Sequence, residues 1–123
     1  MIKSEKQENK GILEDSINYL EQKGFENIKA DIPGYETPRT FLRKKSDVKI
    51  TPDIVADRAG IRHYFDLSLK SEKPQLLKSK WRFLEVFTRM KDYRFKIITR
   101  KGHYKFTNEM LSDLNLKKNL IKI

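Results

Sequence analysis

Two aspartates and a set of nearby lysines are the residues of this chain that could do chemistry together. Asp53 opens the segment "DIVA", and Asp66 lies in "HYFDLSLK", where apolar and polar residues alternate. This alternation predicts a β-strand with Asp66, Ser68 and Lys70 on one face. Two carboxylates that met on neighbouring strands would repel each other and share a divalent cation, which could activate water and neutralise charge on a phosphate. The alternative, on spacing alone, is two solvated strand residues.

Three further residues bear on this interpretation. Pro52 precedes Asp53 and suits the start of a strand beside a site, because it removes an N–H and fixes φ. Glu14 lies beside the apolar stripe of a predicted helix, where it either reaches toward the same ion or is an exposed acid near the helix N-terminus. Lys80 falls in the middle of the apolar arc of a second predicted helix, an arc that also contains Leu76. A lysine there snorkels to solvent, pairs with an acid or serves a site.

The elements that must position these residues follow from periodicity and from turn and cap signals. The first predicted elements are a helix of about 12 residues that stops at Gly24, a strand at 25–32 and a short strand within 40–50, whose lysines lie in a turn. A hairpin follows, with strands at 53–56 and 61–70 and "DRAG" as its turn, and then a helix from Pro74 to about Met90. The last elements are a strand within 93–102, a short helix over 107–116 capped by Thr107 or Asn108, and an edge strand at 119–123. The order α-β-β-β-α-β predicts an α/β (α+β) fold in which helices flank a mixed central sheet. Residues 1–9 are expected to form a loose tail, and residues 10–123 a single domain.

Composition excludes several kinds of site. The chain has 123 residues and no cysteine, which excludes a disulfide framework, a zinc ribbon and thiol catalysis. With only His63 and His103 as histidines, a metal would be held by oxygen ligands, which points to Mg²⁺ or Mn²⁺. The sequence contains neither an apolar run long enough to cross a bilayer nor a recognisable signal peptide. We therefore expect a cytoplasmic protein.

Positive charge is concentrated in one quarter of the chain. The net charge is +10, and residues 70–101 contain eleven Lys or Arg against three acids. Phosphate backbones are the commonest partner of such a field, whereas a soluble basic surface and an anionic membrane are the alternatives. The residues expected to contact nucleic acid are Lys73, Lys78, Arg82, Arg89, Arg100 and Lys101.

These features together resemble those of a known family. The element order, the "PD" that opens one strand and the acid on the next strand resemble the PD-(D/E)XK nuclease superfamily, with its restriction-endonuclease-like fold. The segment "KGILEDSINYLEQKGF" resembles the first helix of archaeal-type Holliday-junction resolvases. The resemblance extends over residues 10–101, and its motifs are short and degenerate. It implies that Asp53 and Asp66 bind Mg²⁺ or Mn²⁺, that the carbonyl of Leu67 lies near the metal, and that Glu14 is an assisting acid.

The chain departs from the family pattern at one position. The family lysine belongs two residues after the second acid, where this sequence has Ser68. Lys70 could reach back along the strand, or the following helix could supply a migrated residue, with Lys80 ahead of Lys73 or Gln75. In a third interpretation, Ser68 marks a binding module without catalysis.

The function implied by the resemblance is metal-dependent hydrolysis of DNA phosphodiester bonds. Branched DNA such as a Holliday junction is the candidate substrate, in DNA recombination or DNA repair. A resolvase would be a homodimer, because two symmetric cuts need two sites. The alternatives are a catalytically silent, nuclease-like nucleic-acid-binding protein and a basic RNA-binding or assembly protein. No segment resembles a base-reading motif, so we expect recognition of nucleic-acid structure or recruitment by a partner.

Overall fold

The chain alternates helices and strands around one central sheet. A computed structural model describes residues 1–2, 9–42 and 48–123. Its elements are α1 (Lys10–Gln22), β1 (Glu26–Ala30), β2 (Phe41–Leu42), β3 (Lys49–Ile50), β4 (Ile54–Arg58), β5 (Ile61–Leu67), α2 (Pro74–Met90), β6 (Arg94–Thr99), α3 (Tyr104–Leu114), the short 3₁₀ helix η2 (Lys117–Asn119) and β7 (Leu120–Lys122). The predicted mixed α/β class is confirmed.

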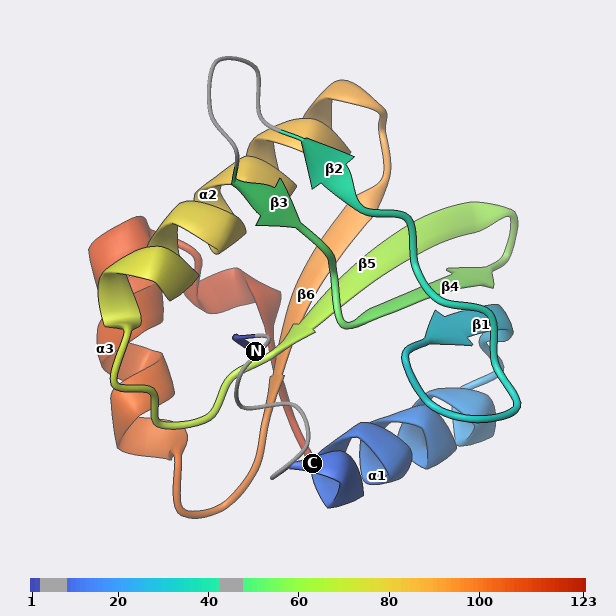
Figure 1. The fold of residues 1–123 in the computed structure, drawn as a ribbon, viewed down its shortest axis with the longest axis horizontal. Helices are drawn as coiled ribbons and strands as arrows, with labels where there is room; N and C mark the ends of the chain where they lie inside the picture. The colour runs from blue at the N-terminus through green and yellow to red at the C-terminus, as the bar shows by residue number, and fades with distance from the viewer. Residues whose placement is uncertain (3–8, 43–47) are drawn as a thin grey trace.

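The central sheet is mixed and has helices on both faces (Figure 1). Its strand order is β1-β4-β5-β6-β7; the pairs β1–β4 and β4–β5 are antiparallel, and β5–β6 and β6–β7 are parallel. Strands β2 and β3 form a separate two-stranded sheet. In β5, Phe65 packs with the α1 residue Ile12, whereas Tyr64 packs with the α2 residue Trp81. Since neighbouring strand residues point to opposite faces, α1 covers one face of the sheet and α2 covers the other.

The β4–β5 hairpin fixes the register of the sheet centre. Ile54 lies opposite Phe65, and Arg58 lies opposite Ile61. The predicted hairpin is therefore confirmed, with a turn tighter than "DRAG". Ala59 and Gly60, the two connecting residues, have φ values of +53° and +76°. Two consecutive positive φ values are typical of the type I′ turn, whose twist matches that of the flanking strands.

Three local predictions are wrong. Strand β5 ends at Leu67, so Lys70 lies in the connection to α2 and not on the strand. Helix α3 begins at Tyr104, and its buried Thr107 faces the sheet, so neither Thr107 nor Asn108 caps the helix. Leu76, predicted to lie in the apolar arc of α2, is 45% exposed; the residues that form the buried stripe are Leu77, Trp81, Leu84 and Thr88.

The beginning of the chain also differs from the expected loose tail. Met1 and Ile2 are buried and belong to the two cores that flank the sheet. The rest of the predicted tail, residues 3–8, lies outside the described residues, as does the predicted lysine turn within 43–47. In the part of the chain that the structure describes, no helix has the length and apolarity needed to cross a bilayer.

The hairpin turn gives a test of the fold. Gly60→Ala should lower the free energy of unfolding by about 1 kcal/mol, because a Cβ is unfavourable at positive φ. Gly11→Ala, in α1, is the matched control and should be neutral or stabilising by up to about 1 kcal/mol. An added Cβ meets no atom within 4 Å at either position, so crowding does not enter the comparison. Urea denaturation measures both; equal effects would contradict the turn.

Candidate active site

Asp53 and Asp66 meet at the centre of the molecule. Because Ile54 pairs with Phe65, the adjoining residues Asp53 and Asp66 lie opposite each other and point to the same face of the sheet. Both side chains are buried, with residue exposures of 1% and 0%. The Asp53 backbone N–H donates to Asp66 Oδ1 (3.2 Å), and the Leu67 N–H donates to Asp53 Oδ2 (2.8 Å). The hairpin therefore holds the two carboxylates together as a dyad.

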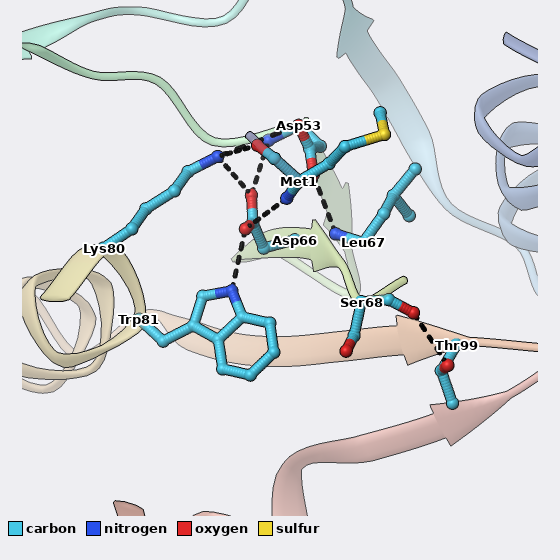
Figure 2. Close-up of polar contacts among 8 residues, drawn as sticks. All are labelled: Met1, Asp53, Asp66, Leu67, Ser68, Lys80, Trp81 and Thr99. Atoms are coloured by element: carbon cyan, nitrogen blue, oxygen red, sulfur yellow. Dashed lines mark hydrogen bonds and ion pairs between the residues drawn. The ribbon is translucent and has the colours of Figure 1, made fainter. Parts of the chain in front are cut away.

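Lys80, a residue of α2, directs its ammonium group at both carboxylates of the dyad (Figure 2). Its Nζ lies 2.9 Å from Asp66 Oδ1 and 3.8 Å from Asp53 Oδ1, and its side chain is only 11% exposed. Lys70 is exposed instead, and its backbone N–H donates to His103 Nδ1 (2.9 Å). Of the two ammonium groups that the sequence left open, the structure brings Lys80 to the carboxylates.

Trp81 contributes a contact that the sequence reasoning missed. Its indole Nε1–H donates to Asp66 Oδ2 at 2.8 Å, and the residue is fully buried. The sequence places Trp81 beside Lys80 on an amphipathic helix, where it reads as a core residue. A buried indole N–H usually finds an acceptor, and that rule was the available signal.

A second missed contact comes from the chain's first residue. The Met1 ammonium nitrogen lies 2.7 Å from Asp53 Oδ2 and 2.8 Å from Asp66 Oδ2. Lys80 Nζ donates to the Met1 carbonyl oxygen at 2.9 Å. A polar segment without periodicity gives no sequence signal for such a contact.

The charges of the dyad and of Lys80 depend on each other. Burial raises the pKa of Asp66, and the neighbouring Asp53 carboxylate raises it further, while Lys80 and the Met1 ammonium oppose this shift. Burial also acts to lower the pKa of Lys80, but the two carboxylates outweigh it and the net shift is upward. The site thus favours a bound cation, since a positive charge relieves the repulsion between the carboxylates.

Ser68, two residues after Asp66, has a packing role in this structure. Its Oγ shares a 2.7 Å hydrogen bond with Thr107 Oγ1, and Thr99 Oγ1 donates to the Ser68 carbonyl at 2.8 Å. The Thr99 and Thr107 hydroxyl oxygens lie 3.0 Å apart. All three residues are buried, so their hydroxyls tie β5 and β6 to α3.

Glu14 is not brought to the dyad. It is an exposed residue of α1, which covers the face of the sheet opposite the carboxylates. Among the described residues, no three His, Cys, Asp or Glu side chains cluster to hold a metal. Glu14 as a metal ligand stays a prediction that this arrangement does not support. The carbonyl of Leu67 as a metal ligand stays a prediction.

The donor set of the dyad nevertheless fits a hard divalent cation. Both Oδ2 atoms converge on one ammonium nitrogen, so the two carboxylates already share a single cation position. Mg²⁺ is commonly held by one or two carboxylates, with water and substrate phosphates completing the coordination. Two aspartates therefore suffice without a third acidic side chain.

A cleft in the surface reaches Lys80. It has a volume of about 600 Å³ and is lined by residues of α2 and of the β2–β3 sheet. Met1, Ile2 and Lys80 contribute to its lining, together with Ser79 and Leu76 of α2. Lys80 thus contacts the dyad on one side and the cleft on the other.

Three of the six predicted basic contact residues lie at the edge of the sheet where β5 ends. Because β5 and β6 are parallel, their C-terminal ends lie at the same edge of the sheet. Arg100 and Lys101 directly follow β6 at this edge, and Lys73 directly precedes α2 in the connection from β5. Lys73 and Lys101 are exposed and Arg100 is half-buried, so all three can contact a ligand that binds at this edge of the sheet.

The other three basic residues are placed differently. Lys78 forms an ion pair with Asp113 of α3 (Nζ–Oδ2, 2.9 Å), which ties it to the packing of two helices. Arg82 and Arg89 are exposed on α2, but Arg89 lies about 13 Å along the helix from Lys80. Arg89 therefore lies far from the dyad.

Comparison with known proteins identified no similar protein. Searches of family models, curated proteins and solved structures found no match to the chain.

The two lysines allow a matched test of the site. Lys80→Met should lower the free energy of unfolding by about 3 kcal/mol, because it keeps the aliphatic stem but removes the charge that compensates a buried carboxylate. Lys70→Met, at an exposed position, should change it by less than about 0.5 kcal/mol. Chemical denaturation at pH 8 without metal measures both, and equal changes would contradict the placement of Lys80.

Proposed function

We propose that this protein is a metal-dependent DNA endonuclease with a restriction-endonuclease-like core. The observation that carries the proposal is the meeting of Asp53, Asp66 and Lys80 in one buried cluster beside a cleft. Two acids on adjacent strands and one lysine are the residue types that the nuclease superfamily uses. The order of α1, β1, β4, β5, α2 and β6 supports the αβββαβ core.

Each residue of the cluster has a distinct part in this proposal. Asp53 and Asp66 hold Mg²⁺ or Mn²⁺, which supplies an activated water and neutralises charge on the phosphate. Lys80 orients the attacking water or stabilises charge on a phosphate oxygen, as a lysine of the α2 helix in place of the strand lysine. Trp81 and the Leu67 N–H fix the orientation of the two carboxylates.

The substrate of the proposal is DNA, bound through its phosphate backbone near the dyad. Lys73, Arg100 and Lys101 lie at the edge of the sheet where β5 ends, and their charges suit backbone contacts that carry no sequence information. A branched substrate such as a Holliday junction would further require a homodimer, because two symmetric cuts need two sites.

Two observations favour a second candidate, a catalytically silent nucleic-acid-binding protein. The Met1 ammonium already occupies the position where the two carboxylates share a cation. Ser68, at the position of the family lysine, is engaged with Thr107 in the packing of α3. A site kept in this state would bind DNA without cleaving it.

Cleavage assays separate the two candidates. Linear, nicked and four-way-junction DNA are incubated with Mg²⁺ or Mn²⁺, and then with EDTA. We expect metal-dependent cleavage that Asp53→Asn, Asp66→Asn and Lys80→Ala each lower by about 100-fold or more. Lys70→Ala, the matched control, should stay within about twofold.

Two outcomes would contradict the enzyme. Salt-sensitive DNA binding without cleavage under either metal would favour the silent protein. Cleavage that persists in Asp66→Asn would show that the activity comes from another site or from a contaminant.

The basic residues at the edge of the sheet where β5 ends give a separate test of DNA binding. Replacing Lys73, Arg100 and Lys101 together with alanine should reduce the slope of log K against log salt by about 3, one unit for each phosphate that the protein no longer neutralises. The control replaces Arg89, Lys91 and Arg94, which removes the same charge from the other end of the sheet and should have a smaller effect. Fluorescence anisotropy over a salt series measures both. Equal slopes would show that DNA does not bind near the dyad.

A further inference from the structure

The first two residues of the chain are built into the candidate site. Met1 is 1% exposed and packs with Leu67 and Leu69 in the core that α1 covers. Ile2 is also buried and packs with Leu77 in the core beneath α2. The two neighbouring side chains therefore enter different cores, which fixes the backbone between them beside the dyad.

Met1 contacts all three charged residues of the cluster (Figure 2). Its ammonium nitrogen binds Asp53 Oδ2 and Asp66 Oδ2 at 2.7 and 2.8 Å, and its carbonyl oxygen accepts from Lys80 at 2.9 Å. These atoms are the ones that would contact a metal and a phosphate in the proposed nuclease. The dyad thus contains a positive charge supplied by the chain itself.

We propose that Met1 and Ile2 form a displaceable plug that regulates the site, in which the Met1 ammonium and a divalent cation exclude each other. This proposal rests on the proposed nuclease function, because it assigns the shared cation position to the metal. The ammonium lies within hydrogen-bond distance of both carboxylates, so a divalent cation held by Asp53 and Asp66 would require Met1 to leave. Leaving exposes two apolar side chains to water, which holds the plug in place.

The cleft gives the plug a second effect. Met1 and Ile2 contribute to the lining of the same 600 Å³ cleft that reaches Lys80. The plug therefore contacts the dyad and Lys80 through Met1 and lines the cleft through both of its residues. Its departure would uncover the carboxylates and Lys80 together, so binding of metal and admission of a phosphate are coupled to one movement.

An N-terminal extension tests the plug through metal affinity. A Gly-Ser-Gly segment placed before Met1 converts the ammonium into an uncharged amide, which cannot neutralise two carboxylates. We expect the extended protein to bind Mn²⁺ at least about tenfold more tightly than the unextended chain. The reason is that Mn²⁺ no longer has to displace an ammonium group from the two carboxylates. Titration calorimetry measures the affinity. The same segment placed after Ile123 is the control and should leave the affinity unchanged.

The outcomes separate the plug from the metal site. If the extension tightens Mn²⁺ binding and Asp66→Asn in the extended protein abolishes it, both proposals are supported. If both chains bind Mn²⁺ equally and Asp66→Asn abolishes binding, the metal site stands and the plug is overturned. If neither chain binds Mn²⁺, the metal site is overturned, and the plug with it.

A measurement on the unextended chain covers the case in which the extension disturbs folding. By the reciprocity of linked equilibria, Mn²⁺ that displaces the ammonium must expose it. Saturating Mn²⁺ should raise the rate of reductive methylation of the Met1 amine by about fivefold or more. The exposed amine of Lys73 should react at the same rate with and without metal. Peptide mass spectrometry follows both amines; an unchanged Met1 rate at saturating Mn²⁺ would overturn the plug.

Discussion

The repulsion between two buried carboxylates is the constraint on which the rest of this structure depends. Asp53 and Asp66 face each other across β4 and β5 and are almost fully removed from water. Burying one unpaired ion costs several kcal/mol, and two like charges in contact cost more. The arrangement persists only with compensating positive charge and hydrogen bonds. Lys80 and Met1 supply the positive charge, while Trp81 and two backbone N–H groups supply the hydrogen bonds.

The fold meets this demand with elements that are distant in sequence. The hairpin register places the two aspartates on the same face, and α2 then crosses that face on its way from β5 to β6. A helix that crosses this face can direct side chains at the dyad, and Lys80 and Trp81 are neighbouring residues of α2. Two buried carboxylates that face each other favour a cation over a neutral ligand. That preference connects the packing to the proposed chemistry.

The sequence predicted the hairpin because its signals are local, namely the alternation in "HYFDLSLK" and the turn residues of "DRAG". The register that pairs Asp53 with Asp66 could not be read from the sequence, so the dyad was expected only from the family resemblance and is shown by the structure. The sequence could not decide between Lys70 and Lys80, because that choice depends on where β5 ends and on the rotation of α2 about its axis. The exposed Leu76 shows how hydrophobicity alone misplaces that rotation. The contact of Met1 has no local signal, since it joins residues more than fifty positions apart.

The central claim is that Asp53 and Asp66 form one cation site served by Lys80. It is tested most directly by a crystal structure of the protein soaked in Mn²⁺ and measured at a wavelength that gives anomalous signal from manganese. The account predicts a single anomalous peak between the two carboxylates, within about 2.3 Å of an oxygen of each, with the Lys80 ammonium beside it and Met1 displaced. A fully soaked crystal without a peak at the dyad, or with Lys80 turned to solvent, would contradict it.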